Sequence, residues 1–331
     1  MNEDNPNRFA DLFALDPKID FLNHGSFGAC PKELLEHQRE LRDLMEREPV
    51  QFFVKTHEKM LDEVRECLAR FVRAKPGELA FVVNATYAVN SVLRSLKLEP
   101  GDELLTTNHE YNACRNVLDF VAAETGAQVV NVPVPFPLSD KAQVTEAVLS
   151  KVTGKTRVAL LDHVTSPTGL VLPMQDLIHG LSERGVDTLV DGAHALGMLD
   201  LDLTALGAAY YTSNCHKWLC TPKGAAFLYV RQDRQDRIRP ACISHAANSP
   251  RTERSRFIQE FDWTGTHDPT PVLCVPKAIE FLTNLLPGGI GVVRKKNRDL
   301  ALYGRDRLCE ALHIKPPCPD DMIGSLAAVP L

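Results

Sequence analysis

The chain has 331 residues, 44% of them hydrophobic, which is enough to bury one large core and a smaller one beside it. Lys and Arg number 37 against 43 Asp and Glu, and the net charge of −6, without a basic stripe, argues against nucleic acid and anionic membranes as partners. The polar, acidic start and the absence of about 18 consecutive apolar residues predict neither a secretory signal nor a membrane span, so we expect a cytoplasmic protein.

Two helical segments, at 33–48 and 56–73, precede an alternation of strands and helices. The predicted strands are short apolar runs at 79–83, 103–107, 128–132, 157–161, 187–190, 208–212 and 225–230. Helical spacing lies between most of them, at 87–97, 112–124, 140–151 and 174–184. This alternation predicts an α/β domain with a seven-stranded, mostly parallel sheet and helices on both faces.

An irregular, Arg-rich stretch begins near residue 231, and helical spacing returns at 271–286 and 291–312. We expect an N-terminal arm over residues 1–20, a large domain over 21–285 and a small C-terminal domain over 286–331. The nine cysteines include no Cys-x-x-Cys pair and no Cys/His cluster at zinc spacing. They are expected to be reduced thiols, most of them buried, and no metal site is predicted.

Polar residues directly after the predicted strands are candidates for a site, because ligands of open parallel sheets bind beyond the carboxyl ends of the strands. Ala85 and Thr86 open a helix whose free N–H groups suit a phosphate, although Thr86 or Asn84 could simply cap that helix. Tyr111 could lie flat against a planar ligand or pack at a loop. The polar segment at 162–169 is explained by a turn rich in Ser, Pro and Gly.

Asp191 and Lys217 follow two further strands. A carboxylate at the end of a buried strand needs a cation or a donor, which could be a ligand or a backbone amide of the next turn. Lys217, between His216 and Trp218, is either a surface lysine or a partly desolvated amine of lowered pKa that can form an imine with an aldehyde. Together, a phosphate-ready helix, a stacking aromatic, an Asp and a Lys supply the parts that hold pyridoxal phosphate.

Several motifs resemble the class V aminotransferase family of pyridoxal-phosphate enzymes. DGAHALG is followed by SNCHKW and PKGAAFLYV, while FLNHGSFGACP, HEYNACRN and FDWTGTHDPTP resemble the isopenicillin N epimerase-like branch. The resemblance covers roughly residues 18–331 and implies a fold type I pyridoxal-phosphate transferase-like architecture. It implies an epimerase, lyase or aminotransferase that acts at the Cα of an amino acid or short peptide.

The resemblance also implies roles for individual residues. Lys217 would form the imine, Asp191 would face the ring nitrogen and His194 would bond the ring hydroxyl. The positions that match phosphate-binding residues are Ala85, Thr86, Asn214 and His216. Thr266 matches a residue that reaches the neighbouring protomer's phosphate, which implies a homodimer with shared sites.

The remaining matches are less uniform. Tyr111 stands at a ring-stacking position that is often His in the family, and Ser166 stands where many relatives carry an Asn against the cofactor. Asn23 and His24 match a loop near the substrate.

Three alternatives remain open at this point: an aminotransferase, a carbon–sulfur lyase or desulfurase, and a cofactor-binding protein with little turnover. A desulfurase needs a mobile nucleophilic thiol, for which Cys309 and Cys318 are the candidates. The third alternative arises because family members continue beyond the stretch that resembles MIGSLAAVPL and supply an Arg for the substrate carboxylate. We therefore expect an incomplete C-terminal domain that ends in an unpaired apolar strand.

Overall fold

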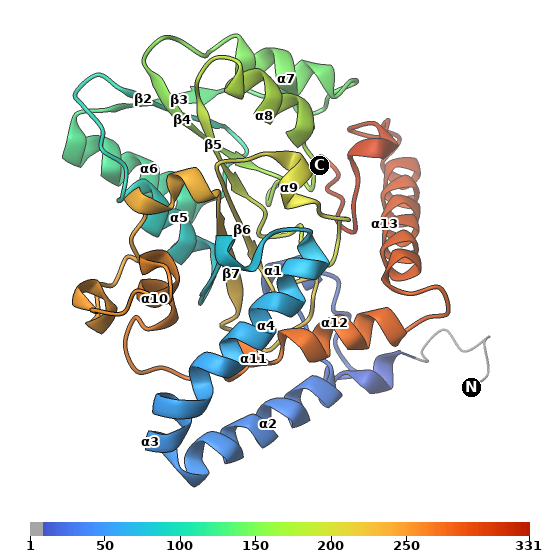
Figure 1. Ribbon diagram of the computed structural model, residues 1–331. Coiled ribbons are helices and arrows are strands. Elements are labelled where there is room, and N and C mark those ends of the chain that lie inside the picture. The colour runs from blue at the N-terminus through green and yellow to red at the C-terminus, as the bar shows by residue number, and fades with distance from the viewer. Residues whose placement is uncertain (1–8) are drawn as a thin grey trace.

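The computed structural model describes residues 9–331, and a seven-stranded sheet lies at its centre (Figure 1). Its strands are β1 (Leu79–Val82), β2 (Glu103–Thr107), β3 (Gln128–Val132), β4 (Thr156–Asp162), β5 (Asp187–Asp191), β6 (Tyr210–Asn214) and β7 (Ala226–Val230). They are ordered β1-β7-β6-β5-β4-β2-β3, and only β7 runs antiparallel to its neighbours. The predicted mostly parallel sheet is confirmed.

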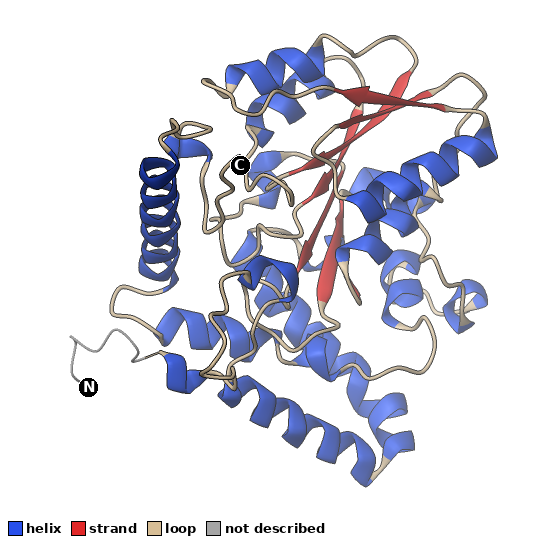
Figure 2. Ribbon diagram, turned by 180° about the vertical axis from the view of Figure 1, so that it is seen from behind, coloured by secondary structure: helices blue, strands red, loops and turns tan. Residues whose placement is uncertain are grey.

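The helices are α1 (His24–Phe27), α2 (Lys32–Arg47), α3 (Pro49–Gln51), α4 (His57–Val72), α5 (Ala85–Leu93), α6 (Asn112–Thr125), α7 (Ala142–Leu149), α8 (Met174–Ser182), α9 (Leu203–Leu206), α10 (Arg256–Asp262), α11 (Thr270–Leu273), α12 (Val275–Asn284) and α13 (Ile290–Leu312). Helices lie on both sides of the strands, as the view from behind also shows (Figure 2). Among the described helices, none has the length and apolar character that crossing a membrane requires.

Alternate residues of each strand enter two different apolar cores, as the period of two in a strand requires. Leu79 and Phe81 of β1 belong to the core under α4, α7, α8 and α12, whereas Ala80 and Val82 belong to the core under α5, α6 and α10. Both faces of the sheet are therefore buried, which explains why its strands appear in the sequence as continuous apolar runs.

Three predicted elements differ from the structure. The strand expected at 208–212 lies at 210–214, because its pairing with β7 continues through the buried side chains of Ser213 and Asn214. The Arg-rich stretch holds α10, which begins where the Ser255 side chain accepts a hydrogen bond from the Ile258 N–H. The helix expected at 271–286 is divided into α11 and α12 at Cys274.

The prediction of a final unpaired strand is wrong. Ile323 forms an isolated antiparallel bridge to Leu170, and the residues beyond it are irregular. Ile323, Cys318 and Met322 are buried in the same core as Leu79 and Phe81, so side-chain burial rather than strand pairing holds this segment. The domain boundaries stay a prediction, and residues 1–8 of the predicted arm lie outside the described residues.

Candidate active site

The carboxyl ends of β4, β5 and β6 bring polar groups together at one edge of the sheet. Asp162 and Asp191, the last residues of β4 and β5, are direct neighbours across the two parallel strands. β6 ends at Asn214, and the following loop carries Lys217. The structure thus places Asp191, His194 and Lys217 at one site, as the strand-end argument requires.

Lys217 lies against His194. The two side chains meet at 3.1 Å between Nζ and Nε2, and the Trp218 Nε1–H donates to His194 Nδ1 at 3.4 Å. An indole N–H can only donate, so Nδ1 of His194 accepts and the imidazole is uncharged.

The electrostatics of the pair agree with that assignment. Burial, together with the charge of Lys217, lowers the pKa of His194 to about 3, so its imidazole is neutral at physiological pH. Burial also lowers the pKa of Lys217, although the carboxylates of Asp191 and Asp162 oppose this change. A larger fraction of Lys217 is therefore a nucleophilic free amine than in an exposed lysine.

Asp191 is buried and accepts two hydrogen bonds. The Ala193 N–H donates to Oδ1 at 2.8 Å, which is the backbone partner considered from the sequence, and the Cys114 thiol donates to Oδ2 at 3.2 Å. Burial raises the pKa of Asp191, and these two donors lower it in part. A carboxylate offers about four lone-pair sites, so Asp191 can accept a further donor such as a protonated ring nitrogen.

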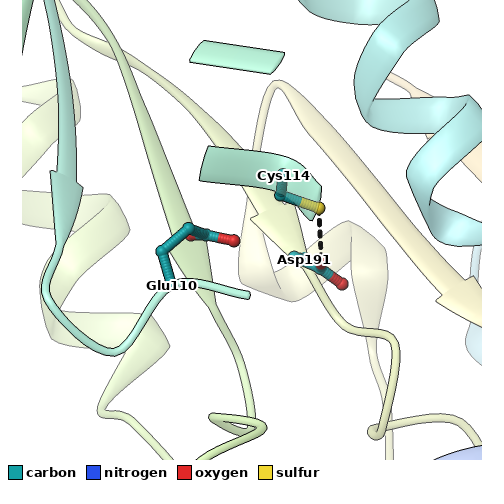
Figure 3. A group of neighbouring side chains, drawn as sticks. All are labelled: Glu110, Cys114 and Asp191. Carbon is teal, nitrogen blue, oxygen red and sulfur yellow. Dashed lines mark hydrogen bonds between the residues drawn. The ribbon is translucent and has the colours of Figure 1, made fainter. Parts of the chain in front are cut away.

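Three residues that sequence reasoning did not assign join this site: Glu110, Cys114 and Asp162. The carboxylate oxygens of Glu110 and Asp191 and the sulfur of Cys114 lie within 4.8 Å of one another (Figure 3). Cys114 lies in the first turn of α6, and Glu110 lies in the loop just before that helix, four residues earlier. A position at the end of a buried strand was the available signal for Asp162.

The start of α5 has the features of an anion site. Asn214 Oδ1 accepts from the Ala85 N–H at 2.9 Å, and Asn84 Oδ1 accepts from the Tyr87 N–H at 2.8 Å, so capping by Asn84 is confirmed. The Thr86 N–H has no hydrogen-bond partner within residues 9–331. One free donor and the positive end of the helix dipole remain for a phosphate.

Four other predicted residues make no side-chain hydrogen bond to Lys217 or Asp191 within the described residues. His216 Nδ1–H donates to the Ala225 carbonyl at 2.9 Å. Tyr111 and Thr266 are exposed and Ser166 is half-buried, and no side-chain hydrogen bond of these three occurs within the described part of the chain. Their roles at the site therefore stay predictions.

The segment of Asn23 and His24 packs against the backbone of the lysine loop. His24 Nε2–H donates to the Lys217 carbonyl at 3.0 Å, and the Ala29 N–H donates to His24 Nδ1 at 3.3 Å. Gly28 has φ +73°, and a Cβ there would lie 2.2 Å from the His216 carbonyl oxygen. Only glycine permits this close approach of the two backbones, so the contact fixes the position of the loop that carries Lys217.

The donor set fits pyridoxal phosphate. An amine with lowered pKa, a buried carboxylate with a spare acceptor site and an unpartnered N–H at a helix start lie at one sheet edge. The atoms of Glu110, Cys114 and Asp191 are also close enough to share a metal ion. However, burial raises the pKa values of Glu110 and Cys114 well above their ordinary ranges, and protonated groups do not bind metals.

Comparisons with known proteins agree with this geometry. Residues 33–322 match the sequence model of the family described as aminotransferase class-V. An isopenicillin N epimerase from Amycolatopsis lactamdurans is 37% identical over 318 residues, covering 92% of this chain and 79% of that protein. A probable chloroplastic L-cysteine desulfhydrase from Arabidopsis thaliana is 30% identical over 331 residues, covering 96% and 69%.

A solved structure of a cystine C–S lyase with its product, cysteine persulfide, superposes with a TM-score of 0.73 at 22% identity, covering 84% of this chain and 74% of that one. At that level of identity the likeness shows the fold, which is the predicted one.

Proposed function

The chain belongs to the class V aminotransferase family, and from this premise we propose that it acts at the Cα of an amino acid or short peptide in an isopenicillin N epimerase-like reaction. It is a pyridoxal-phosphate-dependent enzyme, as its family and fold show. The observation that carries the proposal is the contact between Lys217 Nζ and His194 Nε2 beside the buried Asp191.

Bound pyridoxal phosphate supplies an aldehyde that joins to amines and a ring that withdraws electrons from the substrate's Cα. Asp191, Lys217 and the start of α5 would hold it through the ring nitrogen, the aldehyde carbon and the phosphate. Asp191 keeps a negative charge beside the ring nitrogen. The Thr86 N–H and Asn214 define the end of the site that receives the phosphate.

Lys217 is the base that this geometry offers for the Cα proton. Its Nζ lies 3.1 Å from His194 Nε2, burial lowers its pKa, and His194 in turn accepts a hydrogen bond from Trp218. Lys217 can therefore take a proton at Nζ and return it, while the neutral His194 does not compete for that proton. Return of the proton to the same face restores the substrate, whereas delivery of a proton to the opposite face by a different donor inverts Cα, which is the epimerase-like outcome.

A second candidate function is carbon–sulfur lyase activity on cysteine, as the name of the Arabidopsis relative indicates. Elimination of sulfide needs removal of the Cα proton and then cleavage of the Cβ–S bond, with the sulfur leaving as hydrogen sulfide. Persulfide chemistry of a desulfurase would need an accessible thiol, whereas Cys309 and Cys318 are both buried. Neither of these two thiols meets that need, although Cys242 is exposed.

Exchange of the Cα proton with solvent is the first expected result. Incubation in deuterated water with isopenicillin N, L-cysteine or L-alanine should give deuterium at Cα of the true substrate, seen by NMR, because every candidate reaction passes through loss of that proton. A D-configured product supports the epimerase-like reaction, and sulfide with pyruvate supports the lyase. Bound cofactor without exchange on any amino acid or peptide would refute action at Cα.

We also propose a homodimer in which Thr266 completes the neighbouring site. Thr266 is exposed, and its neighbours Thr264 and His267 line a cavity of about 50 Å³ with Tyr87, from the first turn of α5. Thr266→Ala is expected to weaken cofactor affinity about 10–100-fold. This factor corresponds to the roughly 1.5–3 kcal/mol that a hydrogen bond to a charged group contributes. Absorbance titration measures this, with the exposed Thr252→Ala as control.

Mixing Thr266→Ala with Lys217→Ala protomers separates a shared site from a local one. A mixed dimer should contain one site with both residues intact and bind cofactor there with full affinity. A monomer by light scattering that binds cofactor tightly contradicts the shared site.

A further inference from the structure

Three carboxyl groups gather at the sheet edge that carries Lys217. Asp162 and Asp191 are both buried side by side on β4 and β5, and the Glu110 carboxyl points toward Cys114 and Asp191 (Figure 3). Among the described residues, Lys217 is the cation that interacts with both Asp162 and Asp191. The cation that faces Glu110 is Arg115, which is paired with Asp119 at 3.2 Å.

Ionisation of all three carboxyl groups would leave an uncompensated negative charge in a buried place. One ammonium can balance one carboxylate, and like charges at this separation cannot all persist without water. Two of the three groups must therefore hold a proton for the cluster to be neutral. The Cys114 thiol adds no charge, because it is itself protonated and donates to Asp191.

The hydrogen bonds indicate which group keeps the charge. Asp191 accepts from Ala193 N–H at 2.8 Å and from the Cys114 thiol at 3.2 Å. Asp162 Oδ2 is buried with no hydrogen-bond partner, which suits an uncharged acid and not an anion. Glu110 accepts from the Thr106 hydroxyl and from the Tyr111 N–H, each at 3.2 Å. Both distances are longer than the 2.8 Å between Asp191 and the Ala193 N–H.

The titration behaviour agrees. Burial, with the charge of Asp191, raises the pKa of Glu110 well above its ordinary value. Burial, with the charges of Glu110 and Asp191, does the same to the pKa of Asp162.

We propose that Glu110 and Asp162 are positioning residues that act through Asp191: both stay uncharged carboxylic acids at neutral pH, so that the negative charge of the cluster is confined to Asp191. This proposal rests on the proposed function in one respect, the assignment of Asp191 to the ring nitrogen. When Glu110 and Asp162 are both protonated, Asp191 is the one carboxylate in the cluster. Neither neighbour then competes with Asp191 for the positive charge of Lys217 or of the ring nitrogen.

Infrared spectroscopy of the full chain tests the protonation directly. Protonated carboxyl groups have a C=O stretch that carboxylates lack. At neutral pH, with and without pyridoxal phosphate, Glu110→Gln and Asp162→Asn should each remove one such band, and Asp191→Asn should remove none. Bands that persist in both single variants would overturn the proposal.

The pH dependence of stability provides the second measurement. The folded chain holds two protons that the unfolded chain releases above about pH 4, so the free energy of unfolding falls as pH rises. Each held proton changes the unfolding constant about tenfold per pH unit between pH 5 and 7. Glu110→Gln and Asp162→Asn should each remove one such tenfold slope, whereas Glu63→Gln, at an exposed position of α4, should leave it unchanged.

Cofactor affinity distinguishes this proposal from the proposed function. Because an amide matches an uncharged acid in size and charge, Glu110→Gln should bind pyridoxal phosphate within about threefold of the parent at pH 7. A loss of tenfold or more, with an unchanged stability slope, would show that Glu110 acts as an anion.

If Asp191→Asn proves harmless while both bands are present, the role of Asp191 fails and the protonation of its neighbours stands. If one variant does not fold, the other and the infrared titration of the parent chain still decide.

Discussion

Replacement of Lys217 with Ala is expected to abolish covalent attachment of pyridoxal phosphate and to lower turnover at least about a thousandfold, since loss of a positioned acid–base group alone costs 10²–10⁴. The reason is that Lys217 is the amine that the site desolvates and the one that contacts His194. Borohydride reduction followed by peptide mass spectrometry measures the attachment, and deuterium exchange at Cα measures the turnover.

Lys223 is the matched control. It lies six residues further along the chain. Its Nζ donates to the Gly28 carbonyl at 2.6 Å, so the Lys223 amine is engaged in a contact between two loops. Lys223→Ala should keep the covalent adduct on Lys217. Recovery of a pyridoxyl group on Lys223 of the parent chain would show that the assignment of Lys217 is wrong.

Asp191→Asn is expected to bind the cofactor yet lose most turnover. The amide keeps the shape of the side chain and can accept from Ala193 N–H, but it cannot hold a proton on the ring nitrogen. A charge-assisted bond of this kind contributes roughly 1.5–3 kcal/mol, which corresponds to about a 10–100-fold loss in rate. Turnover at saturating cofactor, with the visible spectrum of the bound cofactor, measures the effect.

Asp176→Asn provides the comparison, because Asp176 is an exposed carboxylate on α8. It should leave rate and spectrum unchanged. Near-normal turnover of Asp191→Asn on the true substrate contradicts the view that this carboxylate keeps the ring nitrogen protonated.

The strands could be predicted from the sequence because both faces of the sheet are buried. A strand covered on both sides must be apolar throughout, so each appears as a short continuous run. α10 could not be predicted in the same way. Its Phe257 and Phe261 are buried, but the arginines around them are exposed or half-buried in ion pairs, and together they give no clear helical period in the sequence.

Some residues of the site could be predicted from the sequence and others could not, for a related reason. Asp191 and Lys217 could be found because each directly follows a strand, and the motifs around them are specific to a family. Asp162 also ends a strand, but its role and that of Glu110 depend on β4 lying next to β5 and on Glu110 approaching Asp191. Strand order is set by pairing between distant segments, and local sequence patterns do not contain it.

The pairing of β1 with β7 also fixes when the site can exist during synthesis and folding. Leu79 pairs with Tyr229, and β7 then pairs with β6, which is how the start of α5 comes to lie beside the loop of Lys217. Most of the chain must therefore emerge and fold before the phosphate end and the lysine end of the site meet. Contacts so distant in sequence form slowly. Pyridoxal phosphate consequently stabilises the finished fold by mass action but cannot serve as a template for its early steps.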